Sequence, residues 1–210
     1  MASGPEGLTV APLGPGELTE AACIVGDAMA DNPVHLAVFG PPEASNRRRQ
    51  SELFAVIYRR TRPRLLVARL EGRPVGVLGM LAWPRCRLGV VDALRLALPV
   101  ARILGSDLVK AARWRLAWGR HHPEEAHWHL GPVAVRPDLQ RRGIGTALMG
   151  RFLDSVDADG LPAYLETDRP ENVRWYGRFG FQVHHRIEVD GVPTWLMWRP
   201  AAGSGIPRPH

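Results

Sequence analysis

The stretch that decides the fold is Val133-Ala-Val-Arg-Pro-Asp-Leu-Gln-Arg-Arg-Gly-Ile-Gly-Thr146. It begins within an apolar run typical of a strand, 127–135, and apolar residues at helical spacing follow from Ile144 onward. We therefore expect the turn 140–146 to connect a strand to the first turn of a helix. The first N–H groups of a helix have no partner within it, and the helix dipole favours an anion there. The segment thus predicts a phosphate-binding turn.

The residues of this turn suit a phosphate. Gly143 and Gly145 lack a Cβ, so the backbone can turn tightly and approach phosphate oxygens, while Arg141 and Arg142 supply positive charge. Two other phosphate-binding motifs do not fit: the lysine of a Walker loop is absent, and Leu148 stands where a dinucleotide-binding fingerprint needs a third glycine. A Gly-x-Gly turn alone is an ordinary strand-to-helix connection, so the interpretation depends on the surrounding sequence.

The surrounding sequence carries a family resemblance. Residues 130–149 resemble the acyl-CoA-binding core of the GNAT N-acetyltransferase superfamily, and Leu165-Glu-Thr-Asp-Arg-Pro-Glu-Asn-Val-Arg-Trp-Tyr-Gly-Arg-Phe-Gly-Phe181 resembles the next strand and helix of that superfamily. The Leu165-Glu-Thr start and the Asn-x-x-x-Tyr spacing look like the branch that includes puromycin N-acetyltransferases. The resemblance implies a mixed α/β fold, with a mostly antiparallel sheet of about seven strands, a splay between the fourth and fifth strands, and helices on both faces.

The resemblance also assigns residues to the cosubstrate, acetyl-CoA. The strand 133–135 would pair its backbone with the pantetheine arm, and the turn 141–146 would hold the pyrophosphate. Asn172 and Tyr176 lie four residues apart, on one face of a helix, and would point at the arm and its sulfur. The alternative for Tyr176 is a core position beside Phe179. The full set of expected cofactor-binding residues is Val133, Ala134, Val135, Arg141, Arg142, Gly143, Ile144, Gly145, Thr146, Asn172 and Tyr176.

The implied reaction is direct attack of an amine on the acetyl thioester in a ternary complex. The amine must lose a proton before it attacks, and the departing thiolate benefits from an acid. Tyr176 is the expected general acid. Two candidates remain for the base: Glu166, at a strand end beside the splay, and His129, on the strand 127–135. The alternatives are a fixed carboxylate for Glu166 and a hydrogen-bonded, partly buried imidazole for His129.

We therefore expect an acetyl-CoA-dependent N-acetyltransferase acting on a primary amine of a small molecule. Two alternatives remain open: a non-catalytic acyl-CoA-binding sensor or interaction module, and an acetyltransferase with a protein or RNA acceptor. The pairs His121-His122 and His184-His185 lack metal-ligand spacing, so no metal is expected. Cys23 and Cys86 stand alone, which favours the reducing cytoplasm over a disulfide scaffold.

Residues 84–123 are helical in composition and predict an insertion between the third and fourth strands, broken or kinked at Pro99. Three interpretations of this insertion stay open. It forms a lid or apolar acceptor pocket with Trp83, Trp114 and Trp118, or it is an added helical layer or homodimer surface, or it contacts a membrane surface.

The insertion also carries the charge of the chain. Residues 84–120 contain eight basic and two acidic residues. The difference of six equals the net charge of the whole chain, +6. Lys110 is the single lysine, so the other 26 basic residues are arginine. This bias is typical of genome base composition rather than of selected phosphate contacts, and nucleic-acid binding is not expected.

The composition of the chain is that of a globular protein, with 210 residues, 45% hydrophobic and 23% charged. We expect one domain over residues 1–200 and a disordered tail over 201–210. No apolar stretch reaches the ~20 residues of a membrane helix, and the first residues lack the pattern of a signal peptide. The expected strands are 8–13, 64–70, 74–81, 127–135, 162–167, 181–189 and 192–198, and the expected helices outside the insertion are 17–30, one capped by Ser45, one from Ile144, and 171–179, with a loop after Pro33.

Overall fold

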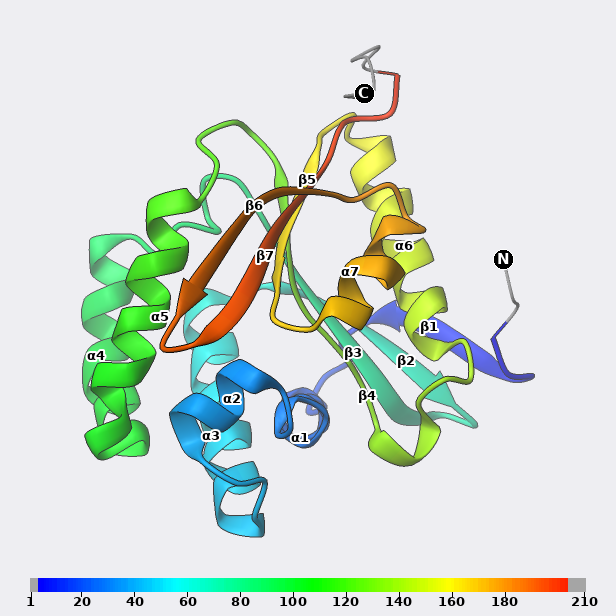
Figure 1. Ribbon diagram of the computed structural model, residues 1–210. Coiled ribbons are helices and arrows are strands. Elements are labelled where there is room, and N and C mark those ends of the chain that lie inside the picture. The colour runs from blue at the N-terminus through cyan, green and yellow to red at the C-terminus, as the bar shows by residue number, and fades with distance from the viewer. Residues whose placement is uncertain (1–3, 204–210) are drawn as a thin grey trace.

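The computed structural model describes residues 4–203, in which seven strands form one sheet of order β1-β2-β3-β4-β5-β7-β6 (Figure 1). The strands are β1 Leu8–Pro12, β2 Arg64–Leu70, β3 Arg73–Ala82, β4 Trp128–Val135, β5 Ala163–Thr167, β6 Gln182–Val189 and β7 Val192–Arg199. The helices are α1 Leu18–Met29, α2 Pro33–Phe39, α3 Ala44–Thr61, α4 Val90–Leu104, α5 Leu108–His121, α6 Ile144–Ala158 and α7 Pro170–Gly177, with 3₁₀ turns at Gly105–Asp107 and Pro137–Leu139. The expected mixed α/β fold with a seven-stranded sheet is confirmed.

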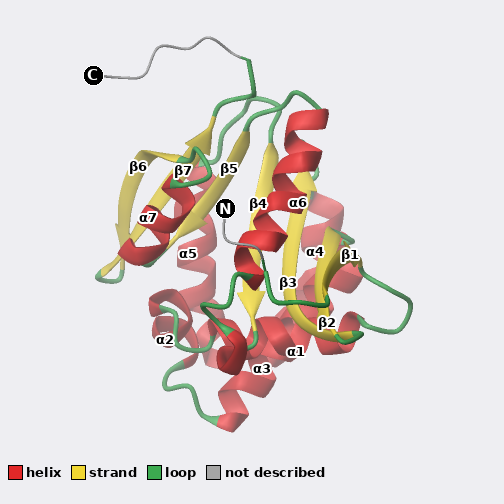
Figure 2. Ribbon diagram, turned by 90° about the vertical axis from the view of Figure 1, so that its right-hand side faces the viewer, coloured by secondary structure: helices red, strands yellow, loops and turns green. Residues whose placement is uncertain are grey.

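The sheet opens between β4 and β5. These two strands are parallel and pair at two positions, Trp128 with Ala163 and His129 with Tyr164, whereas β4 stays paired with β3 as far as Val135. The other neighbouring strands of this sheet are antiparallel. Figure 2 shows β4 and β5 together at one end and apart at the other. The predicted splay is therefore confirmed, and among residues 4–203 no strand pairs with the β5-facing edge of β4 beyond His129.

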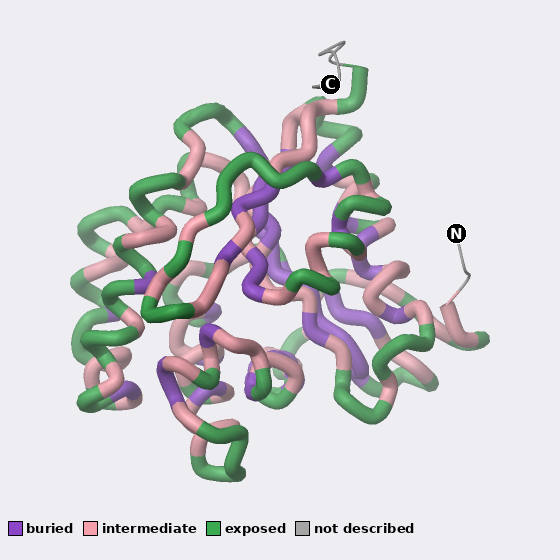
Figure 3. Tube along the Cα trace, viewed as in Figure 1, coloured by how far each residue is buried: buried purple, intermediate pink, exposed green. Residues whose placement is uncertain are grey.

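Helices cover both faces of the sheet, as expected. Side chains of a strand alternate between faces, so Leu66 of β2 packs in the core under α6 while its neighbour Leu65 packs under α1 and α3. Figure 3 shows the buried residues concentrated in the central strands. The α1 and α3 helices approach closely at Gly26, where a Cβ would lie 2.8 Å from the backbone nitrogen of Ser51.

The insertion forms an added helical layer. Its two helices, α4 and α5, stand beside α3 and the β6–β7 hairpin (Figure 1). Leu104 and Trp114 are 2% exposed and pack in a cluster with Phe39 of α2. The expected break lies elsewhere: α4 continues through Pro99, and the chain turns at Gly105, whose φ is +54°. Since an αL-type φ is accessible to glycine, the helix ends there rather than at the proline.

Two local expectations were wrong. The loop expected after Pro33 is the helix α2, because Pro33 occupies its first turn and the Asp168 carboxylate accepts a hydrogen bond from the Val34 N–H at 2.8 Å. The helix expected to be capped by Ser45 begins at Ala44, and its N-cap Glu43 makes no side-chain capping bond. Of the tail 201–210, residues 204–210 lie outside the described residues. None of the described helices combines the length and apolarity needed to cross a bilayer.

Candidate active site

The glycine-containing turn connects β4 to α6 as the sequence predicts. Gly143 is the N-cap of α6 with a φ of +82°, and Arg141 also has a positive φ of +62°. No side chain within the described residues caps α6, so the first N–H groups of the helix keep their hydrogen-bonding capacity for a ligand. Together with the helix dipole, these amides make a site for an anion.

A groove of about 580 Å³ lies over this turn, between α6, α7 and the end of α1. It brings together most of the predicted cofactor-binding residues, namely Val133, Val135, Arg141, Gly143, Ile144, Gly145, Thr146, Asn172 and Tyr176. Ala134 and Arg142 do not line it. Strand alternation turns the Ala134 side chain toward α1, where it is 1% exposed, and the Arg142 side chain is exposed outside the groove.

Several groove residues were not in the expected cofactor-binding set. They come from the end of α1, from the segment before α6, and from α7 and its flanking residues, which the fold brings together. Arg169 joins the first and the last of these, since its Nη2 lies 3.0 Å from Asp31 Oδ1 and its Nε donates to Asn32 Oδ1 at 3.0 Å. The lining residues outside the expected set are Ala28, Met29, Asp31, Asn32, Leu139, Gln140, Arg169, Glu171, Trp175 and Arg178.

Tyr176 combines the two interpretations that its sequence position left open. Its ring packs in the core against Trp175 and Phe181, at centroid distances of 4.9 and 6.0 Å, and the residue also lines the groove. Burial, with a smaller contribution from the Asp168 charge, raises the pKa of Tyr176 above its usual value. The phenol therefore keeps its proton at neutral pH and can donate it.

The two candidates for the base contact each other across the splay. His129 Nε2 donates a hydrogen bond to Glu166 Oε2 at 2.8 Å. Burial disfavours both charges, but the mutual attraction outweighs it, so Glu166 raises the pKa of His129 and His129 lowers the pKa of Glu166. At neutral pH the pair holds an imidazolium and a carboxylate.

A second cavity of about 150 Å³ lies on the α3 side of β4. His129 and Cys86 are among its walls, which are otherwise mostly apolar and include Phe54 and Tyr58 of α3. The Tyr58 hydroxyl is buried and has no hydrogen-bond partner among the described residues. Trp83, Trp114 and Trp118 line neither cavity, so the acceptor pocket expected from the insertion is not built from these tryptophans.

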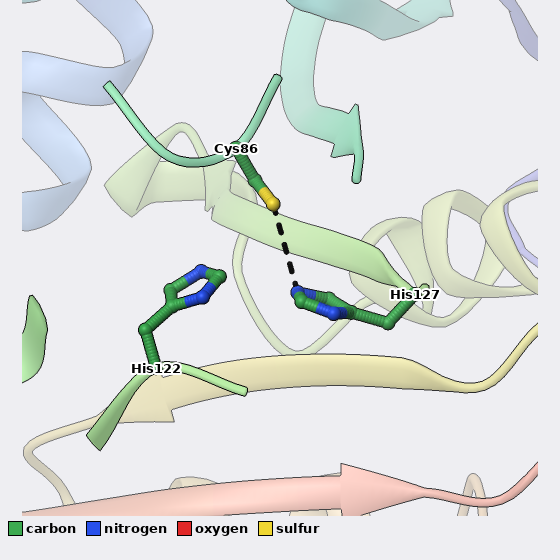
Figure 4. A group of neighbouring side chains, drawn as sticks. All are labelled: Cys86, His122 and His127. Carbon is green, nitrogen blue, oxygen red and sulfur yellow. Dashed lines mark hydrogen bonds between the residues drawn. The ribbon is translucent and has the colours of Figure 1, made fainter. Parts of the chain in front are cut away.

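A cluster of thiol and imidazole groups lies beside this second cavity (Figure 4). The donor atoms of Cys86, His122 and His127 lie within 4.8 Å of one another. Burial opposes ionisation of the thiol, but hydrogen bonds from His122, His127 and His129 lower the pKa of Cys86 to about 5. Of the neighbours His121 and His122, only His122 belongs to this cluster. The His121 ring instead contacts the His185 ring, at a centroid distance of 5.6 Å.

Comparisons with known proteins agree with this geometry. The model of the acetyltransferase (GNAT) family matches residues 33–181. A histone acetyltransferase HPA2 and related acetyltransferase from Corynebacterium glutamicum has a similar fold, with a TM-score of 0.72 and 24% identity over 95% of this chain and 99% of that chain. A GNAT family acetyltransferase from Brucella melitensis, solved with acetyl-CoA, has a TM-score of 0.51 and 18% identity over 97% of this chain and 93% of that chain.

Among curated proteins, the mycothiol acetyltransferase of Streptomyces coelicolor is 34% identical over 70 residues. That of Streptomyces griseus subsp. griseus is 35% identical over 85 residues. These alignments cover 32% and 39% of this chain, but 23% and 25% of the relatives' own lengths. The chain therefore matches about a quarter of each curated relative.

Proposed function

Because the chain belongs to the GNAT family of acetyltransferases, we propose that it transfers an acetyl group from acetyl-CoA to a primary amine of a small molecule. The amine attacks the thioester directly in a ternary complex, without a covalent intermediate on the protein. The observation that carries this proposal is the splay, with a groove and a phenol on its α6 side and a carboxylate–imidazole pair with a small cavity on its α3 side.

The groove suits acetyl-CoA in two respects. The uncapped amides at the start of α6, with Arg141 beside them, match a diphosphate. Within the described part of the chain, no strand pairs with the β5-facing edge of β4 near Val133 and Val135, so its backbone groups are available to the amides of a pantetheine arm. Asn172 of α7 lies along the same groove. When bound, acetyl-CoA supplies the activated acyl carbon.

Tyr176 acts as the general acid. Its raised pKa keeps the phenol protonated, and Tyr176 is among the residues that line the groove, which supports this role. A thiolate leaving group near pKa ~8.5 is stabilised by a proton donor.

Glu166 acts as the base, and His129 positions it. Of the two groups only the carboxylate has a free lone pair at neutral pH, because the imidazole is already protonated in the ion pair. The negative charge of Glu166 also attracts an ammonium ion before its proton is lost. Glu166 lines neither the groove nor the 150 Å³ cavity, but its hydrogen-bonded partner His129 lines the cavity. The acceptor would therefore approach the pair from this cavity, whose size favours a small amine or a single side chain.

The first experiment measures acetyl-CoA binding as a shift in melting temperature. Ligand at about 100 times its dissociation constant stabilises a fold by about 2.7 kcal/mol, which corresponds to roughly 5–10 °C for a chain of this size. The second experiment measures thiol release from acetyl-CoA over a panel of small primary amines.

The outcomes separate the functions. A melting shift with amine-dependent thiol release supports the proposal. A shift without release from any amine, peptide or RNA would instead indicate a non-catalytic acyl-CoA-binding module. Release with peptides or RNA but not with small amines, weakened strongly by salt, would assign a macromolecular acceptor.

We also propose that residues 1–200 act as one domain in the reducing cytoplasm. Both cysteines are free thiols, as a reducing compartment favours. A single cooperative melting transition is the expected result for one domain.

A further inference from the structure

The cluster beside the small cavity joins three distant parts of the chain. Cys86 lies between β3 and α4, at the start of the insertion, His122 follows α5 at its end, and His127 directly precedes β4. Figure 4 shows the thiol and the two imidazole rings turned toward one another. Cys86 Sγ lies 3.6 Å from His127 Nε2, and His127 is fully buried.

The backbone fixes which nitrogen of each ring faces the cluster. His127 Nδ1 donates to the Glu125 carbonyl at 2.7 Å, and His122 Nδ1 donates to the Pro123 carbonyl at 3.1 Å. A carbonyl oxygen only accepts, so both Nδ1 atoms carry a proton, and loss of the proton from Nε2 gives each ring a lone pair that faces the cluster. Metal-binding histidines are oriented in this way, with the second nitrogen bonded to a carbonyl or carboxylate.

A fourth imidazole lies beside the group. As an imidazolium, His129 donates from Nε2 to Glu166 and from Nδ1 to His122 Nε2, which lies 3.3 Å away. A metal ion bound at His122 Nε2 would displace this second proton and free the Nδ1 lone pair of His129. A carboxylate behind a histidine is a common support of a zinc ligand.

The distances match a tetrahedral ion. Bond lengths of about 2.05 Å to nitrogen and about 2.3 Å to sulfur give edges of about 3.3 Å between two nitrogens and about 3.6 Å between sulfur and nitrogen. Both edges occur here, between His122 and His129 and between Cys86 and His127. Thiolate and imidazole donors select Zn²⁺ and similar borderline metals over Mg²⁺ or Ca²⁺.

We propose that Cys86 Sγ, His122 Nε2 and His127 Nε2 bind one Zn²⁺-class ion, whose fourth position is filled by water or by His129 Nδ1, 3.3 Å from His122 Nε2. The ion joins both ends of the insertion to the start of β4. It thereby holds α4 and α5 on the protein core and fixes the wall of the small cavity to which Cys86 and His129 belong. Metal binding is measured directly, so its test needs no turnover.

The test is a titration of the chelator-treated full chain with Co²⁺, followed by Zn²⁺. We expect one Co²⁺ per chain, with the near-ultraviolet band of a thiolate ligand and the intense visible bands of tetrahedral coordination, and displacement of both by one Zn²⁺. Cys86→Ser should abolish the thiolate band, and His122→Ala should weaken Zn²⁺ binding by at least about 100-fold. Zn²⁺ should raise the melting temperature of the unmodified chain and leave that of Cys86→Ser unchanged.

Two variants serve as controls. Cys23→Ser removes the exposed cysteine, and His185→Ala removes a histidine outside the cluster; both should bind as the unmodified chain does. The proposal is wrong if no thiolate band forms, if the band depends on Cys23, or if His185→Ala weakens binding as much as His122→Ala. Since Cys86 and His122 are only partly buried, their variants should fold, and far-ultraviolet circular dichroism checks this.

Discussion

Replacing Tyr176 with phenylalanine tests the assignment of the general acid while changing one oxygen atom. The ring lies 4.9 Å from Trp175 and 6.0 Å from Phe181, contacts that phenylalanine keeps. No hydrogen bond of the Tyr176 hydroxyl occurs within residues 4–203, so its removal orphans no partner. We therefore expect the free energy of unfolding to change by less than about 1 kcal/mol.

The effect on turnover should be much larger. General acid catalysis typically contributes about 10²–10⁴-fold, or roughly 2.7–5.4 kcal/mol of barrier. The assay follows thiol release from acetyl-CoA at saturating amine, with the dissociation constant of acetyl-CoA measured separately by calorimetry. We expect kcat to fall by at least 100-fold and the dissociation constant to change by less than about threefold.

A matched control separates chemistry from packing. Phe181→Leu disturbs the same core and leaves the Tyr176 hydroxyl in place, so it should lower stability by about 1 kcal/mol while keeping kcat within tenfold. The acid assignment is refuted if Tyr176→Phe retains wild-type kcat. It is also refuted if the loss is matched by Phe181→Leu, or appears mainly as weaker acetyl-CoA binding, because either result indicates positioning.

Three further variants or pairs test other parts of the structure. Gly26→Ala should destabilise the fold by about 1–3 kcal/mol, because a Cβ would collide with the α3 backbone. Gly150→Ala, the control with open space around it, should stabilise the fold by up to about 1 kcal/mol. Equal melting temperatures of the two variants would contradict the close approach of α1 and α3. Gly143→Ala places a side chain at a φ of +82°, costs about 1–2 kcal/mol, and should weaken acetyl-CoA binding in calorimetry; tighter binding would count against the turn as the anion site. In pH–rate profiles, Glu166→Gln should lose most activity and the acidic limb of kcat/KM. His129→Ala should move that limb to higher pH, because the cation that lowers the pKa of Glu166 is gone. If the limb stays at the same pH in His129→Ala, Glu166 is not the base.

The sequence predicted the parts of the fold that local chemistry determines. The expected strands 64–70 and 74–81, and likewise 181–189 and 192–198, form as neighbours joined by hairpin turns at Glu71-Gly72 and Asp190-Gly191, with positive φ at both positions of each turn. The turn at Gly143 also forms as expected, because glycine there permits the left-handed conformation that starts α6. In these segments the residues that decide the structure are neighbours in the chain.

The parts that were missed depend on distant residues. The helix α2 is stabilised at its start by Asp168, 134 positions from Val34, and no local pattern reveals that bond. The choice between Glu166 and His129 could not be made from the sequence, since the two side chains form one ion pair across the splay. The cysteine–histidine cluster was missed for the same reason, because 36 positions and the helices α4 and α5 separate Cys86 from His122.

The position of β4 between two cavities has a consequence for the order of events in turnover. The 580 Å³ groove is on the α6 side of this strand and the small cavity is on its α3 side, so under the proposed function each substrate would have its own entrance. Neither molecule would then block the route of the other, which favours random addition over a compulsory sequence. Each product should then compete with the substrate that uses the same entrance. A single inhibitor that occupies both cavities would have to extend through the gap between β4 and β5 beyond His129.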